Sequence, residues 1–133
     1  MTRKSLFMVT VVVPDMDDGI AHYTRDWGFA LVEDSRHASG HRWVEIGTDD
    51  GANIRLVEAT TDEHRSVVGR QAGGRVAFFL KMTGFDRTLE RWAKTAIEIV
   101  EAPREEVYGR VAVVRDKFGN RWDVFDEEYR VAA

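Results

Sequence analysis

The chain has 133 residues, 44% of them hydrophobic, a formal net charge of −4 and no cysteine. An acidic chain without a basic run is not expected to bind nucleic acid non-specifically, and the lack of cysteine excludes disulfides and thiolate metal sites. No apolar run approaches the ~20 residues of a membrane-spanning helix. We therefore expect one cytoplasmic domain, 1–133, with a hydrophobic core and with neither a nucleic-acid nor a membrane partner.

The first half of the chain predicts a strand, a helix and three further strands. Segment 6–13 is apolar and β-rich, and Asp15 or Asp17 is suited to cap the helix that follows. Apolar residues then recur at helical spacing as far as Trp27, and Gly28 is a typical residue just past a helix. Strands are expected at 29–34, 42–46 and 53–57, the last two joined by a turn-rich segment at 48–51.

A polar linker, 59–74, with a short helix expected near 62–68, separates this half from a second half of the same form. The second half begins with a predicted strand at 75–81. An amphipathic helix follows, with Phe85, Leu89 and Trp92 on one face. The remaining strands are expected at 97–100, 107–115 and 120–125, with a break at Ala102 and Pro103.

The two halves repeat one another at a constant offset, since Arg42 corresponds to Arg110 and Arg55 to Asp123. Internal repetition indicates a duplicated module, and two helices among many strands indicate an α+β architecture. We predict two tandem βαβββ modules that form a curved mixed sheet around a concave cavity, with the helices on its outer face. Module 1 spans about 6–58 and module 2 about 75–126.

Several short motifs resemble those of one superfamily. They are Val13-Pro14-Asp15 before the first helix, His22-Tyr23 and Trp27-Gly28-Phe29 in and after it, Tyr108-Gly109-Arg110, and Asp116-Lys117-Phe118-Gly119-Asn120-Arg121-Trp122 in the last hairpin. Together with the duplication, they make the chain resemble the vicinal oxygen chelate superfamily of glyoxalases, bleomycin-resistance proteins and extradiol dioxygenases over about 6–125. Lys117 and Phe118 depart from the proline and polar residue usual in that family.

In metal-dependent members of that superfamily, four inward positions supply histidine or carboxylate ligands. The resemblance places Met8, Arg55, Arg75 and Asp123 at these positions. A thioether and two guanidinium groups are unsuited to a divalent cation, and only Asp123 offers a suitable oxygen. We therefore expect no bound metal and no other cofactor.

Side chains alternate along a strand, which predicts the neighbours of the inward positions. Alternation puts Arg42, Val44 and Ile46 beside Arg55, and Arg110, Ala112 and Val114 beside Asp123. It also aligns Arg75, Ala77 and Phe79, and leaves Glu45 on the helix-facing side, which is a poor place for a charge. The candidate ligand-binding residues are Met8, Thr10, Arg55, Arg75, Phe79, Tyr108, Arg110 and Asp123.

We expect a metal-independent small-molecule-binding protein of the glyoxalase/bleomycin-resistance type, with an anionic or polar-aromatic ligand held by Arg55 and Arg75. A competing interpretation is that Arg55, Arg75 and Asp123 pair with one another as an internal salt bridge. The resemblance also implies a homodimer.

The main alternative is an enzyme of the same superfamily, a glyoxalase-like lyase, an isomerase or a dioxygenase-like catalyst. Asp123 or Glu45 would then be the general base, with an arginine stabilising an oxyanion. A carboxylate beside arginines is expected to have a lowered pKa, which makes it a weak base. A third possibility is an interaction module without a ligand, which a large closed cavity would argue against.

Overall fold

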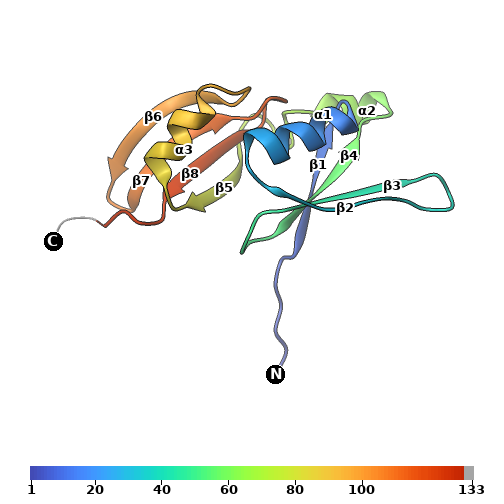
Figure 1. The fold of residues 1–133 in the computed structure, drawn as a ribbon, viewed down its shortest axis with the longest axis horizontal. Coiled ribbons are helices and arrows are strands. Elements are labelled where there is room, and N and C mark those ends of the chain that lie inside the picture. The colour runs from blue at the N-terminus through green and yellow to red at the C-terminus, as the bar shows by residue number, and fades with distance from the viewer. Residues whose placement is uncertain (131–133) are drawn as a thin grey trace. The chain divides into compact units, whose positions relative to one another are not determined.

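The computed structural model describes residues 1–130, which fall into two compact units, Met1–Ser66 and the residues from Val67 onward. Each unit contains a strand, a helix and three further strands (Figure 1). The predicted α+β class and the tandem βαβββ modules are confirmed. Each module forms a four-stranded mixed sheet of its own.

Unit 1 places its first strand beside its last. Its sheet has the order β1-β4-β3-β2, in which β1 and β4 are parallel and the other neighbours antiparallel. The short helix predicted in the linker is present as α2 (Asp62–Val67), which buries none of its side chains. The other elements are β1 (Met8–Val13), α1 (Met16–Ala21), η1 (His22–Asp26), β2 (Ala30–Arg36), β3 (Arg42–Gly47) and β4 (Asn53–Glu58).

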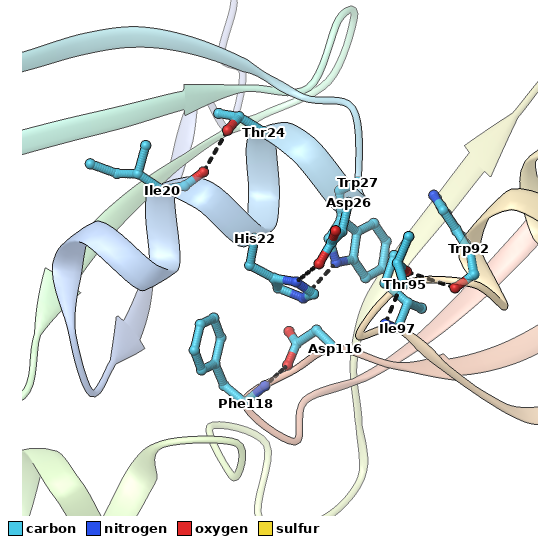
Figure 2. A network of polar contacts seen from close by, with 10 residues as sticks. All are labelled: Ile20, His22, Thr24, Asp26, Trp27, Trp92, Thr95, Ile97, Asp116 and Phe118. Atoms are coloured by element: carbon cyan, nitrogen blue, oxygen red, sulfur yellow. Dashed lines mark hydrogen bonds and ion pairs between the residues drawn. The ribbon is translucent and has the colours of Figure 1, made fainter.

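The helix of unit 1 begins as the sequence predicts, because the Asp15 side chain accepts a hydrogen bond from the backbone N–H of Asp18 at 2.9 Å. Its second half, η1, is a π-helical turn, which sequence periodicity did not predict. There the buried His22 accepts at Nε2 from Trp27 Nε1 (3.1 Å), so its hydrogen lies on Nδ1, 2.7 Å from Asp26 Oδ2 (Figure 2). Both ring nitrogens of the buried histidine are therefore satisfied.

One face of the unit 1 sheet forms the core against α1. Gly19 permits a close approach, because a Cβ at this position would lie 3.0 Å from Val13 Cγ2 and 3.3 Å from Leu56 Cδ1. The helix therefore lies directly on the side chains of β1 and β4. The buried aliphatic side chains of these strands and of β3 are Val11, Val13, Val44, Ile46, Ile54 and Leu56.

Unit 2 repeats this topology, with the sheet order β5-β8-β7-β6 and a parallel β5–β8 pair. The sequence predicted a break at Ala102 and Pro103, but β6 runs through both residues. The pairing register with β7 instead shifts between Glu101 and Arg104, as expected where a proline cannot donate to the ladder. The elements are β5 (Val76–Met82), α3 (Phe85–Trp92), β6 (Glu98–Glu106), β7 (Gly109–Arg115) and β8 (Arg121–Asp126).

The core of unit 2 follows the predicted helical face. Phe85, Leu89 and Trp92 of α3 are buried. Ala112 and Val114 of β7 and Trp122 and Val124 of β8 are buried as well, and they face one another across the ladder. Within residues 1–130 no helix is both long and apolar enough to cross a bilayer.

The turn between β7 and β8 is organised by the buried Asp116. Its Oδ1 accepts from the backbone N–H groups of Phe118 (3.1 Å) and Asn120 (2.9 Å), the first of which is drawn in Figure 2. Its Oδ2 accepts from Asn120 Nδ2 (3.2 Å) and Trp122 Nε1 (3.0 Å). The motif from Asp116 to Trp122, which contributes to the family resemblance, therefore has a structural role. Its one carboxylate fixes the turn and orients the side chains of Asn120 and Trp122.

Candidate functional site

Each unit has one sheet face opposite its buried core residues, which we call the open face. On the open face of unit 1, the strand register places Glu45 opposite Arg55. The expectation that Val44 and Ile46 accompany Arg55 is wrong, because both point into the core. Residues directly opposite one another in an antiparallel pair share a face, so Glu45 lies beside Arg55. Glu45 therefore does not lie on the helix-facing side of the sheet, where a charge would be unfavourable.

Arg42, also expected beside Arg55, has a structural role instead. Its Nε and Nη2 donate to the two oxygens of Asp34, both at 2.9 Å, and its Nη2 lies 3.0 Å from Asp17 Oδ1 of α1. The forked hydrogen bond lowers the pKa of Asp34 and raises the pKa of Arg42. This arginine clamps β3 to β2 and to the helix.

The Arg55 guanidinium is stacked and held in place. Its central carbon lies 4.2 Å from the centroid of the Trp43 ring, which is a cation–π contact. Its Nη2 lies 2.8 Å from Nε2 of His41, which must accept because arginine can only donate. Its Nε is buried and has no hydrogen-bond partner. A fixed guanidinium that uses few of its five N–H donors is prepared to bind an acceptor that the unit itself does not supply.

The rings of Trp43, His41 and His37 form a cluster beside this arginine. His37 meets Trp43 edge-on at a centroid distance of 6.5 Å, and it lies nearly parallel to His41 at 6.3 Å. Side-chain alternation in the sequence did not predict Trp43 and His41 as neighbours of Arg55. Trp43 could have been found from the correct strand register, since it lies two residues before Glu45. His41 belongs to the β2–β3 connection, where alternation gives no information.

The remaining polar pair on this face is Glu45 with Asn53, whose Nδ2 donates to Glu45 Oε2 at 2.8 Å. Along β1, Met8 lies beside Asn53 and Thr10 beside Arg55 in the parallel register. The open face of unit 1 thus brings together the predicted residues Met8, Thr10 and Arg55.

On the open face of unit 2, Asp123 lies between Val113 of β7 and Phe79 of β5. The expectation that Arg110, Ala112 and Val114 accompany Asp123 is wrong, because Ala112 and Val114 are core residues one register step away. Arg110 lies 2.8 Å from Asp86 Oδ1 and 3.6 Å from Asp126 Oδ2, with its guanidinium over the Phe85 ring.

Burial dominates the electrostatics of Asp123. It raises the pKa of this carboxyl above its ordinary value of 3.8, against the smaller opposing effects of Arg104 and Arg121 and with a small contribution from Glu101. The sequence-based expectation was a lowered pKa. The reason for the difference is that burial on the sheet removes water from the carboxyl, which no count of neighbouring arginines reveals.

The predicted alignment of Arg75 with Phe79 does not hold. The β5–β8 register is irregular between Val76 and Phe78, and Val76 is the residue opposite Arg121. The irregularity interrupts the alternation between Phe79 and the residues before it. Arg75 precedes β5 and is exposed.

Aromatic side chains extend the open face of unit 2. Phe79 and Tyr108 are exposed, and Tyr108 meets Phe125 edge-on at a centroid distance of 6.2 Å. Phe125 lies two residues from Asp123 on β8 and shares its face. The predicted residues Phe79 and Asp123 are neighbours in the β5–β8 register, and Tyr108 lies in the β6–β7 turn against Phe125.

The residues at the four family positions do not fit a divalent metal. Arg55 and Arg75 carry positive charge and no lone pair, and Met8 offers only a soft sulfur. Within residues 1–130, no three side chains of His, Asp or Glu are grouped so as to hold a metal ion. These four positions are therefore unsuited to a catalytic divalent metal.

A pocket of about 450 Å³ opens in unit 2 between the start of α3 and the residues after β8. Its acidic groups are already engaged, since Asp86 and Asp126 bind Arg110, and Glu128 accepts from the backbone N–H of Gly84 at 2.9 Å. None of the predicted ligand-binding residues lines it.

Comparison with known proteins places this geometry in a family. An uncharacterized protein from Shewanella frigidimarina is 36% identical over 125 residues, covering 92% of this chain and 93% of its own. The crystal structure of UcmS2 superposes with a TM-score of 0.79 at 25% identity, covering 95% of this chain and all of that one. TnmS3, an antibiotic binding protein from Streptomyces sp. CB03234, gives a TM-score of 0.73 at 20% identity, covering 95% and 98%.

Residues 5–124 match the family model described as Glyoxalase/Bleomycin resistance protein/Dioxygenase superfamily. This range includes both βαβββ modules, the capped first helix and the Asp116 turn. With the match spanning most of the sequence and each half folded as a βαβββ module, the chain belongs to the glyoxalase/bleomycin resistance protein/dioxygenase superfamily.

Proposed function

We propose that this protein binds a small organic molecule without a metal, and that the ligand is an anionic or polar-aromatic compound. The observation that carries the proposal is the state of Arg55. Its guanidinium is stacked on Trp43 and bonded to His41, yet its buried Nε lacks a partner. A carboxylate or phosphate oxygen would bind the guanidinium donors that neither Trp43 nor His41 uses.

Preorganisation makes this arginine a suitable anchor. A mobile arginine loses side-chain entropy when it binds, whereas a stacked and bonded one has already lost most of that freedom. A planar ligand could also stack on the exposed side of the guanidinium, as aromatic groups commonly do. An aromatic carboxylate satisfies both features and is the simplest probe.

The family supports binding as a role for the fold. TnmS3, similar in fold to this chain, is an antibiotic binding protein. We propose Met8 and Thr10 as further contacts on the Arg55 face, and Arg75 as a second guanidinium for the anion. Tyr108 and Arg110 stay as candidates at the edge of unit 2. The acidic, cysteine-free composition supports a cytoplasmic location.

Calorimetric titration with 1-naphthoate, compared with uncharged 1-naphthalenemethanol, tests the proposal. Removing a charge-assisted hydrogen bond should weaken naphthoate binding in Arg55→Ala by about tenfold or more. Arg25→Ala removes the same charge from an exposed position on η1 and should bind as the wild type does. Wild-type affinity in an Arg55→Ala, Arg75→Ala double variant would refute the proposal.

One observation from the structure favours the alternative that the protein is an enzyme. Burial raises the pKa of Asp123, which makes its carboxylate a stronger base than the sequence suggested. Glu45 is a poorer candidate because it is engaged by Asn53. Hydrogen–deuterium exchange at a carbonyl-activated C–H, followed by NMR in D2O, would detect such a base. Exchange that is lost in Asp123→Asn would favour an enzyme.

We also propose that two chains form a homodimer, which the family resemblance supports. Sedimentation velocity at several protein concentrations tests this directly. A species of twice the 15.2 kDa chain mass is expected, and a monomer throughout would contradict it.

A further inference from the structure

Asp123 is a half-buried carboxylate whose neighbours across the sheet are apolar. Val113 on β7 is almost fully buried, and Phe79 on β5 exposes most of its ring. Neither side chain can donate a hydrogen bond. A carboxylate in such a place has lost part of its hydration without receiving a protein donor in return.

The charged groups nearest to Asp123 are committed to other partners. Glu101 accepts from Arg104 Nη1 at 3.0 Å and lies 3.6 Å from Arg121 Nη2. Arg104 also donates from Nε to Glu106 at 2.7 Å. Both arginines are thus ion-paired with acids of β6, although the buried Nε of Arg121 has no hydrogen-bond partner. Within unit 2, among residues 67–130, the Asp123 carboxylate forms no hydrogen bond or ion pair.

Lys81 is a further cation on this face. It lies on β5 two residues after Phe79, and its partner in the β5–β8 register is Phe125 rather than Asp123. It is exposed. A well-hydrated ammonium on a flexible stem gains little from an exposed ion pair, so Lys81 does not satisfy the carboxylate.

We propose that Asp123 and Phe79 form a binding site for an organic ammonium ion that carries an apolar or aromatic group. The ammonium would donate N–H hydrogen bonds to the carboxylate and restore the interactions lost on burial. The apolar group would lie on the exposed Phe79 ring, whose face also attracts positive charge. This site uses unit 2 alone and takes a ligand of opposite charge to the one proposed for Arg55.

The electrostatics support this assignment. The pKa of the Asp123 carboxyl is raised chiefly by burial, so the charged form lacks full stabilisation in the protein by itself. A bound cation stabilises that form. The site therefore favours a cation over a neutral molecule of the same shape.

Titration of the full-length protein with benzylammonium, followed by NMR chemical shifts, tests the proposal. Benzyl alcohol is the uncharged comparison, and tetramethylammonium is a cation without N–H donors. Benzylammonium is expected to bind about tenfold more tightly than either of them. Equal affinity for benzyl alcohol would overturn the proposal.

Substitutions assign the binding to the two residues. Asp123→Asn keeps the shape and removes the charge, and should weaken benzylammonium binding by about tenfold. Phe79→Ala should weaken it by about threefold to fivefold. Glu90→Gln removes an acid from the exposed side of α3 and should leave the affinity unchanged. Wild-type affinity in Asp123→Asn would show that Asp123 does not bind the ammonium ion. An equal loss of affinity in Glu90→Gln would show that only general charge attraction operates.

The two proposals fail separately. Naphthoate binding should survive in Asp123→Asn, and benzylammonium binding should survive in Arg55→Ala. A change of benzylammonium affinity in Arg55→Ala as large as that in Asp123→Asn would overturn the assignment of the ammonium site to unit 2 alone.

Discussion

Trp43 and Arg55 form a stacked pair in which the centre of the guanidinium lies 4.2 Å from the indole ring centroid. The two residues sit on neighbouring strands and share the open face because of the β3–β4 register. The ring holds the guanidinium in one orientation without using any of its N–H donors. The stack therefore positions the arginine while leaving it free to bind.

The stack predicts the effect of Trp43→Leu. This change keeps an apolar side chain but removes the π-face, which is worth about 0.5–1 kcal/mol at a partly exposed site. Naphthoate affinity should fall about threefold to fivefold, measured by calorimetry. Replacing the buried Trp92 should affect stability rather than binding, so its variant distinguishes a local effect from a general one. Unchanged affinity in Trp43→Leu would mean that the stack has no role in binding.

Asp123 predicts a pH dependence of stability with a definite sign. Its folded-state pKa is raised above the ordinary 3.8, so the folded protein binds this proton more tightly than the unfolded chain does. The ionised carboxyl consequently destabilises the fold at neutral pH, and this penalty fades as the pH falls through the raised pKa towards 3.8. Asp123→Asn removes the penalty.

Urea unfolding at a series of pH values checks this prediction. Asp123→Asn should have a higher midpoint than the wild type at pH 7, and the difference should shrink on acidification. A variant that is less stable than the wild type at pH 7 would show that the carboxylate has a stabilising partner.

Asp116→Ala should be strongly destabilising. The buried carboxylate accepts four hydrogen bonds, including those from the Asn120 backbone and the Trp122 indole. Truncation leaves several buried donors without an acceptor, and we expect a loss of about 3–5 kcal/mol in the free energy of unfolding. Chemical denaturation measures it. Lys94→Ala, at an exposed position after α3, is the control and should change stability by less than about 0.5 kcal/mol.

Gly69→Ala should also destabilise the protein. Gly69 has φ of +72°, and a Cβ there would overlap the backbone carbonyl oxygen of Phe118. Both the strained backbone and the clash oppose the substitution, which we expect to cost about 2–4 kcal/mol. Gly73 has a similar φ of +67° but open space around it, so Gly73→Ala isolates the backbone contribution. Equal losses in the two variants would show that the packing against Phe118 is unimportant.

Much of the fold could be predicted from the sequence because the information is local and repeated. Apolar periodicity placed α3, and Asp15 marked the start of α1. The constant offset between the halves then showed that the same topology occurs twice. Each signal agrees with the others, as expected for a sequence that specifies one fold.

Which residues face one another across the hairpins could not be predicted, because that depends on the register set by each hairpin. A shift of one residue reverses which side chains point to the core. Side-chain alternation predicted that Val44 lies beside Arg55, whereas in the structure Val44 is buried and Glu45 pairs with Arg55. The irregular register at Val76 likewise interrupts the alternation between Arg75 and Phe79. The raised pKa of Asp123 depends on burial between strands, which a linear pattern does not record.

Arg55 and Asp123 occupy corresponding positions of the duplicated module, yet they carry opposite charges. The duplication therefore preserved the scaffold while its two copies acquired different chemistry at one equivalent point. We expect that exchanging these two side chains between the halves would keep the strand order and interchange the charge preferences proposed for the two open faces.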